Sequence, residues 1–257
     1  MFSTRHRPQC VPTAGRDPVK AMILAAGRGE RMRPLTDQKP KPLLEVDGKA
    51  LIVWHIERLR AAAIRDIVIN HAWLGGMMER ALGDGAALGV RITYSAETEA
   101  LETAGGIARA LPMLGEAPFL VINGDVYCEW DFRRASSAAA RLLHSSLAAW
   151  LVMVPNPPQH AGGDFYIDNG VIRDKGMAGA SAAYTFGGIG IYRPSLFAGV
   201  RQGAKAPLAP LLRRAMAAGL VAGELFDGAW TDVGTPSRLH QLDAALRLAR
   251  SARTGLK

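Results

Sequence analysis

The chain has 257 residues, of which 49% are hydrophobic and 21% charged, and its formal net charge is +8. This size and composition are typical of one soluble α/β domain with a substantial core. They exclude a membrane-embedded protein, because the longest apolar runs, such as residues 22–26, fall far short of the ~20 residues of a spanning helix. The positive surplus favours an anionic ligand. Since no interleaved basic and aromatic patch and no zinc-ligand spacing accompanies it, we expect no nucleic-acid partner.

Residues 1–18 differ in composition from the rest of the chain. They contain three arginines and three prolines and have almost no apolar periodicity or continuous apolar segment. This pattern is unlike a secretory signal, and it predicts a disordered extension outside the fold. Cys10 and Cys128 lack metal-ligand spacing and do not suggest a disulfide framework. A reduced, cytoplasmic setting is therefore expected.

From residue 19 onward, short apolar runs alternate with segments of helical periodicity. The apolar runs predict strands over 20–24, 66–70, 90–94, 119–123 and 147–154. The periodic segments predict helices over 52–62, 74–82, 103–114 and, after an N-cap at Asp131, to about residue 144. This succession predicts an α/β fold of Rossmann-like type, with a mostly parallel sheet and helices on both faces.

The rhythm changes after Pro155. Two runs, 164–168 and 171–174, flank Asn169-Gly170, which is the strongest hairpin signal in the chain. A strand over 184–192, a helix over 207–218 and a final helix from 237 to about 252 follow. We predict one domain over residues 19–257, with a nucleotide-binding half over about 19–154 and a sugar-binding half over about 155–257.

The loop after the first strand combines small residues with cations. Its small residues let the backbone approach a ligand and direct N–H groups at phosphate oxygens. Arg31 and Lys41 add two cations to the same loop, which suits a triphosphate. The loop begins with Leu24-Ala25-Ala26-Gly27, with Gly29 two positions later, and all of these residues except Leu24 are small.

Two other glycine-loop types do not fit this segment. A dinucleotide-binding loop needs a third glycine where Met32 stands and an acidic residue where Asn70 ends the second strand. A P-loop fails as well, because Gly48-Lys49-Ala50 lacks the required pattern. A structural turn stays an alternative for the glycines alone.

Asn123-Gly124-Asp125 follows the predicted strand over 119–123. A carboxylate at the carboxyl end of a strand lies where open α/β sheets bind ligands. Asp125 on its own could also be an ordinary turn aspartate.

Taken together, these residues resemble the signature of the nucleotidyltransferases that activate sugar 1-phosphates, L-A-A-G-x-G-x-R followed by P-K. The resemblance implies the nucleotide-diphospho-sugar transferase fold. It implies that Arg31 and Lys41 are catalytic residues that contact the nucleotide phosphates. It also implies that Mg²⁺ is bound by Asp125 and by Asp232, which stands in a W-x-D-x-G-T element. Two aspartates plus substrate phosphates are a sufficient oxygen set for Mg²⁺.

The same resemblance assigns residues to the two substrates. Glu97 corresponds to a position that reads the base, where a carboxylate could accept a hydrogen bond from uracil N3–H, and Thr103 could equally cap its helix. The nucleotide-binding residues implied are Leu24, Ala25, Ala26, Gly27, Gly29, Glu97, Thr103, Ala104, Gly105 and Asn123. The sugar-binding residues implied are Gly163, Asp164, Thr185 and Gly188.

Within the family, L-E-T-A-G-G at residues 101–106 is similar to the uridylyltransferases that act on N-acetylmuramate 1-phosphate in peptidoglycan recycling. This resemblance implies transfer of UMP from UTP to that sugar phosphate, with release of pyrophosphate, by a monomer or small homo-oligomer. Glucose-1-phosphate thymidylyltransferase and mannose-1-phosphate guanylyltransferase are alternatives within the family. A nucleotide-sugar sensor without catalytic activity is the alternative outside it.

Overall fold

The computed structural model describes residues 19–174 and 183–254. The predicted extension over residues 1–18 lies outside them. Aliphatic and β-branched runs form a nine-stranded central sheet in the order β5-β4-β1-β6-β11-β8-β12-β10-β9. Its strands are β1 (Ala21–Leu24), β4 (Asp66–His71), β5 (Arg91–Ala96), β6 (Phe119–Asn123), β8 (Ala149–Val154), β9 (Phe165–Asp168), β10 (Val171–Asp174), β11 (Thr185–Tyr192) and β12 (Val221–Leu225).

The sheet is largely parallel in its N-terminal part and mixed beyond it. Strands β5, β4, β1 and β6 pair in parallel, so their carboxyl ends meet at one edge. Strand β11 is antiparallel to both β6 and β8, and β12 is parallel to β8. The β9–β10 hairpin closes the other end, antiparallel to β12.

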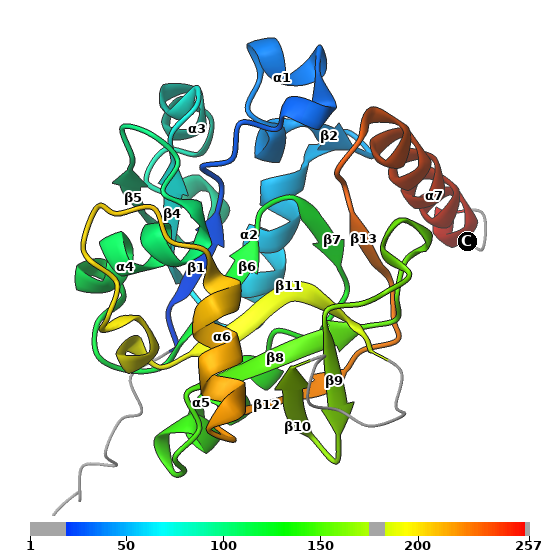
Figure 1. Ribbon diagram of the computed structural model, residues 1–257. Coiled ribbons are helices and arrows are strands. Elements are labelled where there is room, and N and C mark those ends of the chain that lie inside the picture. The colour runs from blue at the N-terminus through cyan, green and yellow to red at the C-terminus, as the bar shows by residue number, and fades with distance from the viewer. Residues whose placement is uncertain (1–18, 175–182, 255–257) are drawn as a thin grey trace, which may run out of the picture.

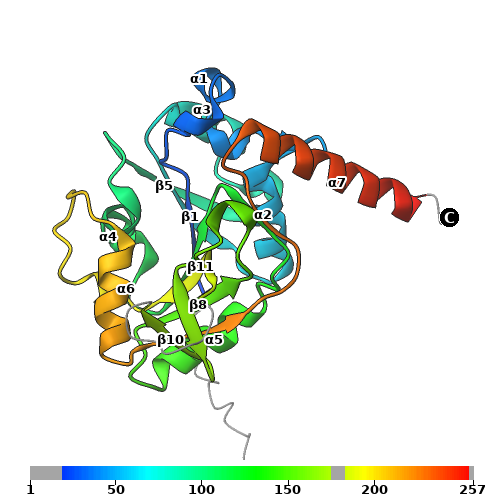
Figure 2. The ribbon, with the colours of Figure 1, turned by 45° about the vertical axis from the view of Figure 1, so that its right-hand side comes forward.

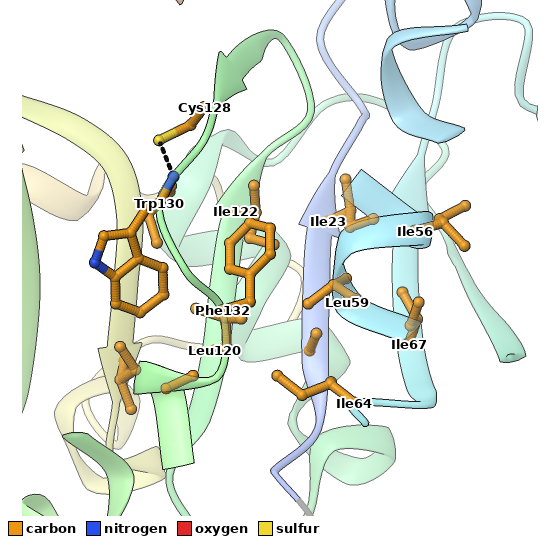
Figure 3. Close-up of a cluster of buried hydrophobic side chains, with 14 of the residues drawn as sticks. Ile23, Ile56, Leu59, Ile64, Ile67, Leu120, Ile122, Cys128, Trp130 and Phe132 are labelled. Carbon is orange, nitrogen blue, oxygen red and sulfur yellow. Dashed lines mark hydrogen bonds between the residues drawn. The ribbon is translucent and has the colours of Figure 1, made fainter. Parts of the chain in front are cut away.

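Helices cover both faces of the sheet, as predicted (Figure 1). One face packs against α2 (Leu51–Ala61), α3 (Gly75–Leu82) and α5 (Arg134–Leu143). The other face packs against α4 (Glu102–Leu114) and α6 (Leu208–Ala217). Figure 3 shows the first of these cores, where Ile56 and Leu59 of α2 lie over Ile23 of β1, and Trp130 and Phe132 lie beside β6.

Two small sheets and several short helices complete the fold. The small sheets are β2 (Glu45–Val46) with β3 (Lys49–Ala50), and β7 (Val126–Cys128) with β13 (Trp230–Asp232). The short helices are α1 (Leu35–Gln38), η1 (Glu30–Met32), η2 (Lys41–Leu43), η3 (Ala86–Leu88), η4 (Pro158–His160) and η5 (Pro194–Phe197).

The last helix, α7 (Pro236–Thr254), follows directly after β13. Its first turns pack on a third core through Leu239 and Leu242, and its carboxyl end projects beyond the rest of the chain (Figure 2). No helix within residues 19–174 and 183–254 has both the length and the apolar character that crossing a bilayer requires.

The long predicted elements are confirmed, with boundaries shifted by one or two residues. The hairpin turn has Asn169 at φ 49° and Gly170 at φ 80°, and Val171 pairs with Asp168. These left-handed angles are those of the turn that an Asn-Gly pair favours.

The helix expected directly after Asp131 begins later, at Arg134. The Asp131 side chain accepts the Arg133 N–H at 3.1 Å, and its carbonyl accepts the Arg134 N–H at 3.0 Å. Asp131 therefore closes a turn that precedes α5, so its expected position as the N-cap is wrong. The helix α4 instead begins one residue before the predicted start, at Glu102, and has no side-chain cap from Thr103.

Candidate active site

The loop predicted to hold phosphates leaves β1 at the carboxyl edge of the sheet, between β4 and β6. Gly29 adopts φ +67°, and a Cβ there would stand 3.0 Å from Thr36 Cγ2 and 3.3 Å from Lys41 Cβ. Glycine at this position lets the loop turn back onto η2, which carries Lys41. Gly27 is different, because a Cβ on it would meet no atom within 4 Å.

A cavity of about 450 Å³ opens at this edge, within the size range of small-ligand sites. It brings together ten of the residues predicted from the sequence: Leu24, Ala25, Ala26, Gly27, Gly29, Arg31, Lys41, Thr103, Asn123 and Asp125. Seven further residues that sequence reasoning did not single out for ligand binding also line it: Glu30, Met32, Pro42, Asn70, Ala100, Glu102 and Gly234.

Lys41 is held in place by Asp125, which was predicted as a metal ligand. Its side chain is only 8% exposed, and its Nζ lies 2.7 Å from Asp125 Oδ2. Arg31, by contrast, is exposed on η1 and has no ion-pair partner among the described residues. The cavity therefore presents one buried, oriented cation and one cation available for a mobile phosphate group.

The two aspartates predicted to bind metal are brought to adjacent strands. Asp125 stands just before β7 and Asp232 ends β13, where it pairs in register with Val126. The Val233 N–H donates to the Asp125 carbonyl at 2.9 Å. Sequence reasoning did not predict β7 or β13, so this antiparallel contact, which joins residues over a hundred positions apart, is a finding of the structure.

The donor set around these aspartates suits a hard divalent cation. Asp125 Oδ2 accepts from Lys41, and Asp232 Oδ2 accepts from Arg238 Nη1 at 2.6 Å. Each Oδ1 accepts no hydrogen bond within the described residues, so one oxygen of each carboxylate is available for a metal ion. Those residues hold no ready-made cluster of three or more metal-ligating side chains, so further ligands would have to come from substrate or water.

The balance of charged residues around the cavity is also relevant to the binding of a metal ion. Arg31 and Lys41 contribute two positive charges, whereas Glu30, Glu102 and Asp125 contribute three negative ones. A triphosphate in this cavity would therefore face net negative charge. A divalent cation bound with it would reverse that balance.

Of the three ligand-binding residues predicted in α4, only one lines the cavity. Thr103 faces the cavity, but Ala104 is fully buried. The N–H groups of Ala104 and Gly105 both donate to the Ala206 carbonyl, and a Cβ on Gly105 would stand 2.3 Å from the Ala204 carbonyl oxygen. Ala104 and Gly105 thus dock α4 against the segment before α6.

Glu97 lies behind the cavity wall and is not among the lining residues. It is 6% exposed, and both of its carboxylate oxygens accept hydrogen bonds, from Asn70 Nδ2 at 2.7 Å and from the Leu101 N–H at 2.9 Å. Asn70, which sequence reasoning considered only as the end of a strand, lines the cavity. A polar residue at the carboxyl end of a parallel strand was the signal that could have identified it.

The predicted sugar-binding residues are placed on the other side of β6. Asp164 accepts the Phe186 N–H at 2.9 Å, and its other oxygen lies 2.9 Å from His160 Nε2. Thr185 donates to Asn156 Oδ1 at 2.9 Å, and a Cβ on Gly163 would stand 2.8 Å from the same oxygen. These contacts tie the loop after β8 to β11.

Gly188 connects this group to the cavity. It lies in a bulge of β11 with φ +72°, and a Cβ on it would stand 2.8 Å from Asn123 Nδ2. Trp230 of β13 donates to the Gly187 carbonyl at 2.9 Å. The predicted sugar residues are therefore adjacent to the cavity through Asn123, although Gly163, Asp164, Thr185 and Gly188 do not line it.

A buried histidine supports β7, the strand that directly follows Asp125. His55 of α2 lies 2.7 Å from the Val126 carbonyl oxygen through Nε2, and the ring is 1% exposed. Burial lowers the pKa of His55 to about 4, so the ring is neutral at pH 7 and Nε2–H donates to the carbonyl. Burial likewise raises the pKa of Tyr127 on β7 to about 12.

Comparisons with known proteins agree with the family that the sequence resembles. The nucleotidyl transferase family matches residues 20–170. The N-acetylmuramate alpha-1-phosphate uridylyltransferase of Neisseria meningitidis is 54% identical over 229 residues, covering 88% of this chain and 97% of that protein. The protein of the same name from Caulobacter vibrioides is 37% identical over 242 residues, covering 91% and 98%.

Solved structures agree with the fold. A Bacillus anthracis protein crystallised with sucrose matches with a TM-score of 0.77 at 24% identity, covering 89% of this chain and 95% of that one. HddC of Yersinia pseudotuberculosis, complexed with GMP-PN, matches with a TM-score of 0.70 at 19% identity, covering 89% and 99%. At such identities the likeness concerns the fold alone, and it confirms the predicted nucleotide-diphospho-sugar transferase fold.

Proposed function

The chain belongs to the nucleotidyl transferase family, and we propose that it transfers UMP from UTP to N-acetylmuramate 1-phosphate with release of pyrophosphate. The observation that supports the reaction best is the cavity at the carboxyl edge, where Arg31, Lys41 and Asp125 converge with the small residues of the signature loop. The choice of substrates is supported by the two relatives of that name, which this chain matches over nearly their whole length.

The reaction needs no covalent enzyme intermediate, because a sugar phosphate is already an anionic nucleophile. Its oxygen attacks the α-phosphorus of UTP, and the bond from that phosphorus to the bridging oxygen of pyrophosphate breaks. The protein's task is then to position two anions and to offset their repulsion.

Lys41 is suited to hold the α-phosphate. It is a buried cation with a fixed direction, and its partner Asp125 lies on the same side of the cavity. Arg31 is suited to the β- and γ-phosphates, since it lines the cavity, is exposed to solvent, and has a guanidinium that can follow departing pyrophosphate. The backbone around Ala26 and Gly27 lines the cavity between them.

Asp125 and Asp232 are proposed to hold Mg²⁺ through their Oδ1 atoms. A divalent ion bound there would supply positive charge to the phosphates. Arg238 keeps Asp232 oriented through Nη1, and a Cβ on Gly234 would stand 2.3 Å from Arg238 Nη2. Glycine at position 234 therefore leaves room for this arginine.

The remaining assignments are also proposals. The uracil would lie along Ala100 and Thr103, and the sugar would extend past Asn123 toward Gly188 and Asp164. The nucleotide-binding half, residues 19–154, and the sugar-binding half, 155–257, would then contribute to one site. We expect a cytoplasmic enzyme of nucleotide-sugar synthesis in peptidoglycan recycling, acting as a monomer or small homo-oligomer.

The test is pyrophosphate release with Mg²⁺, over a grid of the four ribonucleoside triphosphates and dTTP against several sugar 1-phosphates. Selective release with UTP and N-acetylmuramate 1-phosphate is the expected result. Turnover with dTTP and glucose 1-phosphate, or with GTP and mannose 1-phosphate, would keep the reaction and replace the substrates. Binding of nucleotide without release from any pair would favour a sensor and contradict the proposal.

A further inference from the structure

Two buried polar side chains connect the two walls of the cavity. Asn70 is the next-to-last residue of β4 and Glu97 follows β5, and they are 2% and 6% exposed. Within the described residues Glu97 has no cationic partner, so its charge is stabilised by neutral donors alone. Such a group is costly to bury unless its hydrogen bonds are complete, which makes its arrangement informative.

Three hydrogen bonds connect these residues in a line. The Ala25 N–H donates to Asn70 Oδ1 at 2.9 Å, Asn70 Nδ2 donates to Glu97 Oε1 at 2.7 Å, and the Leu101 N–H donates to Glu97 Oε2 at 2.9 Å. We call these four residues and their bonds the Asn70–Glu97 network. It joins the phosphate loop, which starts at Ala25, to the wall formed by Ala100 and Thr103, through the N–H of Leu101.

The neighbouring helix is adapted to this network. A Cβ on Gly106 of α4 would stand 2.8 Å from Asn70 Nδ2 and 2.8 Å from Glu97 Oε1. Gly106 has no positive φ, so backbone conformation does not call for glycine there. Glycine is instead explained by the space that the two side chains occupy.

We propose that Glu97 is a positioning residue that acts through Asn70 and Leu101 and does not touch the base. The Asn70–Glu97 network sets the separation between the phosphate loop and the wall formed by Ala100 and Thr103. Nucleotide choice then follows from the shape of the cavity between these walls. The kinetic part of this inference rests on the nucleotidyl transfer proposed above.

The proposal can be tested by exchanging donors and acceptors within the network, because each hydrogen bond has a defined direction. Asn70→Asp places a second carboxylate against Glu97, and Glu97→Gln places an amide donor against either Asn70 Nδ2 or the Leu101 N–H. Each single variant therefore breaks one bond of the line. In the double variant N70D/E97Q, the new amide at position 97 donates to the new carboxylate at position 70. Both backbone N–H groups then keep an acceptor, with the same shape and the same net charge.

For each single variant we expect KM for UTP to rise about ten- to a hundredfold, with a smaller change in kcat, because a buried hydrogen bond to a charged group is lost. The double variant should return KM to within roughly threefold of wild type. Glu116→Gln, the same change at an exposed carboxylate, is the matched control and should leave KM unaltered. If E97Q alone switches nucleotide preference and N70D/E97Q does not recover UTP selectivity, Glu97 reads the base directly and the proposal is overturned.

A second measurement does not depend on turnover. Amide hydrogen exchange at Ala25 and Leu101 should be slow in wild type, faster in both single variants and in Gly106→Ala, and slow again in N70D/E97Q. Fast exchange at both amides in the wild type would overturn the network. Absence of pyrophosphate release with slow exchange in the wild type would defeat the proposed reaction while leaving the network intact.

Discussion

The nucleotide side and the sugar side of this site are built in different ways. On the nucleotide side, Lys41, Asn70 and Glu97 are all less than 10% exposed, at 7%, 2% and 6%, and each has a fixed polar partner. On the sugar side, Thr185 is equally buried at 6%, but its partner Asn156 lies in the loop after β8, and the Asp164 and His160 side chains are 36% and 45% exposed. The nucleotide side is thus fixed by contacts between buried groups, whereas the sugar side depends on where the loop after β8 lies against β11.

Removing Lys41 should have the largest effect on the nucleotide side. Lys41→Ala deletes the buried cation 2.7 Å from Asp125, and we expect kcat to fall by a factor on the order of 10² to 10³ while the fold is kept. Steady-state pyrophosphate release measures kcat, and circular dichroism checks that the fold is kept. Lys39→Ala is the control, because Lys39 forms only an exposed ion pair with Glu45. Near-normal turnover of Lys41→Ala would show that the assigned role is wrong.

The next largest effect is a pH-dependent loss of stability caused by His55, which donates to the Val126 carbonyl next to Asp125. The pKa of His55 is lowered to about 4, so the unfolded chain binds this proton more readily than the folded one. The stability that the neutral ring contributes is therefore complete above pH ~6.5 and is lost as the pH falls toward 4, by about 3 kcal/mol at ~1.4 kcal/mol per pKa unit.

Chemical unfolding at several pH values checks this prediction. His55→Gln, which cannot be protonated, should lose less stability than wild type between pH 6.5 and 4. His144→Gln changes an exposed histidine and should follow the wild-type curve. Equal acid sensitivity of His55→Gln and wild type would contradict the prediction.

A smaller effect is expected where the two sides meet. Gly188→Ala places a Cβ 2.8 Å from Asn123 Nδ2 at a left-handed backbone position, which should cost about 1–2 kcal/mol of stability. Displacement of Asn123 should also raise KM for the sugar phosphate. Thermal unfolding and kinetics would be compared with Gly199→Ala, whose Cβ meets no atom within 4 Å. An unchanged melting temperature and KM would argue against the bulge as the junction of the two sides.

The smallest effect should come from the outer support of the phosphate loop. Trp73 donates from Nε1 to the Thr36 carbonyl at 3.1 Å, and its ring lies 4.6 Å from the Arg28 guanidinium carbon. Trp73→Phe keeps a ring but loses the hydrogen bond, so KM for UTP should rise about fivefold, equivalent to ~1 kcal/mol. Arg28→Ala, which leaves the hydrogen bond, should change KM less. The reverse order would show that the cation, and not the hydrogen bond, holds the loop.

Features that are local in the sequence could be predicted, whereas contacts between distant segments could not. The phosphate loop is local in sequence, so Arg31 and Lys41 could be assigned to one site, and the long strands were predicted from their apolar runs. The short strands β7 and β13 have three residues each. They are stabilised by pairing between distant segments, and no local periodicity reveals such pairing.

Glu97 shows a second limit. Its position relative to the family signature predicts a base-reading residue, but a sequence does not show which donors surround a carboxylate. Only the folded chain brings Asn70 and the Leu101 N–H to its two oxygens. The sugar side is harder to predict from the sequence for a similar reason. Asn156, Gly163 and Thr185 are brought into contact only by the conformation of the loop after β8.

The most direct test of the proposed reaction is the Mg²⁺-dependent transfer of label from α-labelled UTP to N-acetylmuramate 1-phosphate. We predict a labelled nucleotide sugar formed in equal amount to pyrophosphate, and almost none with Lys41→Ala. Labelled UMP released without a sugar product, or the same yield with Lys41→Ala, would contradict the central claim.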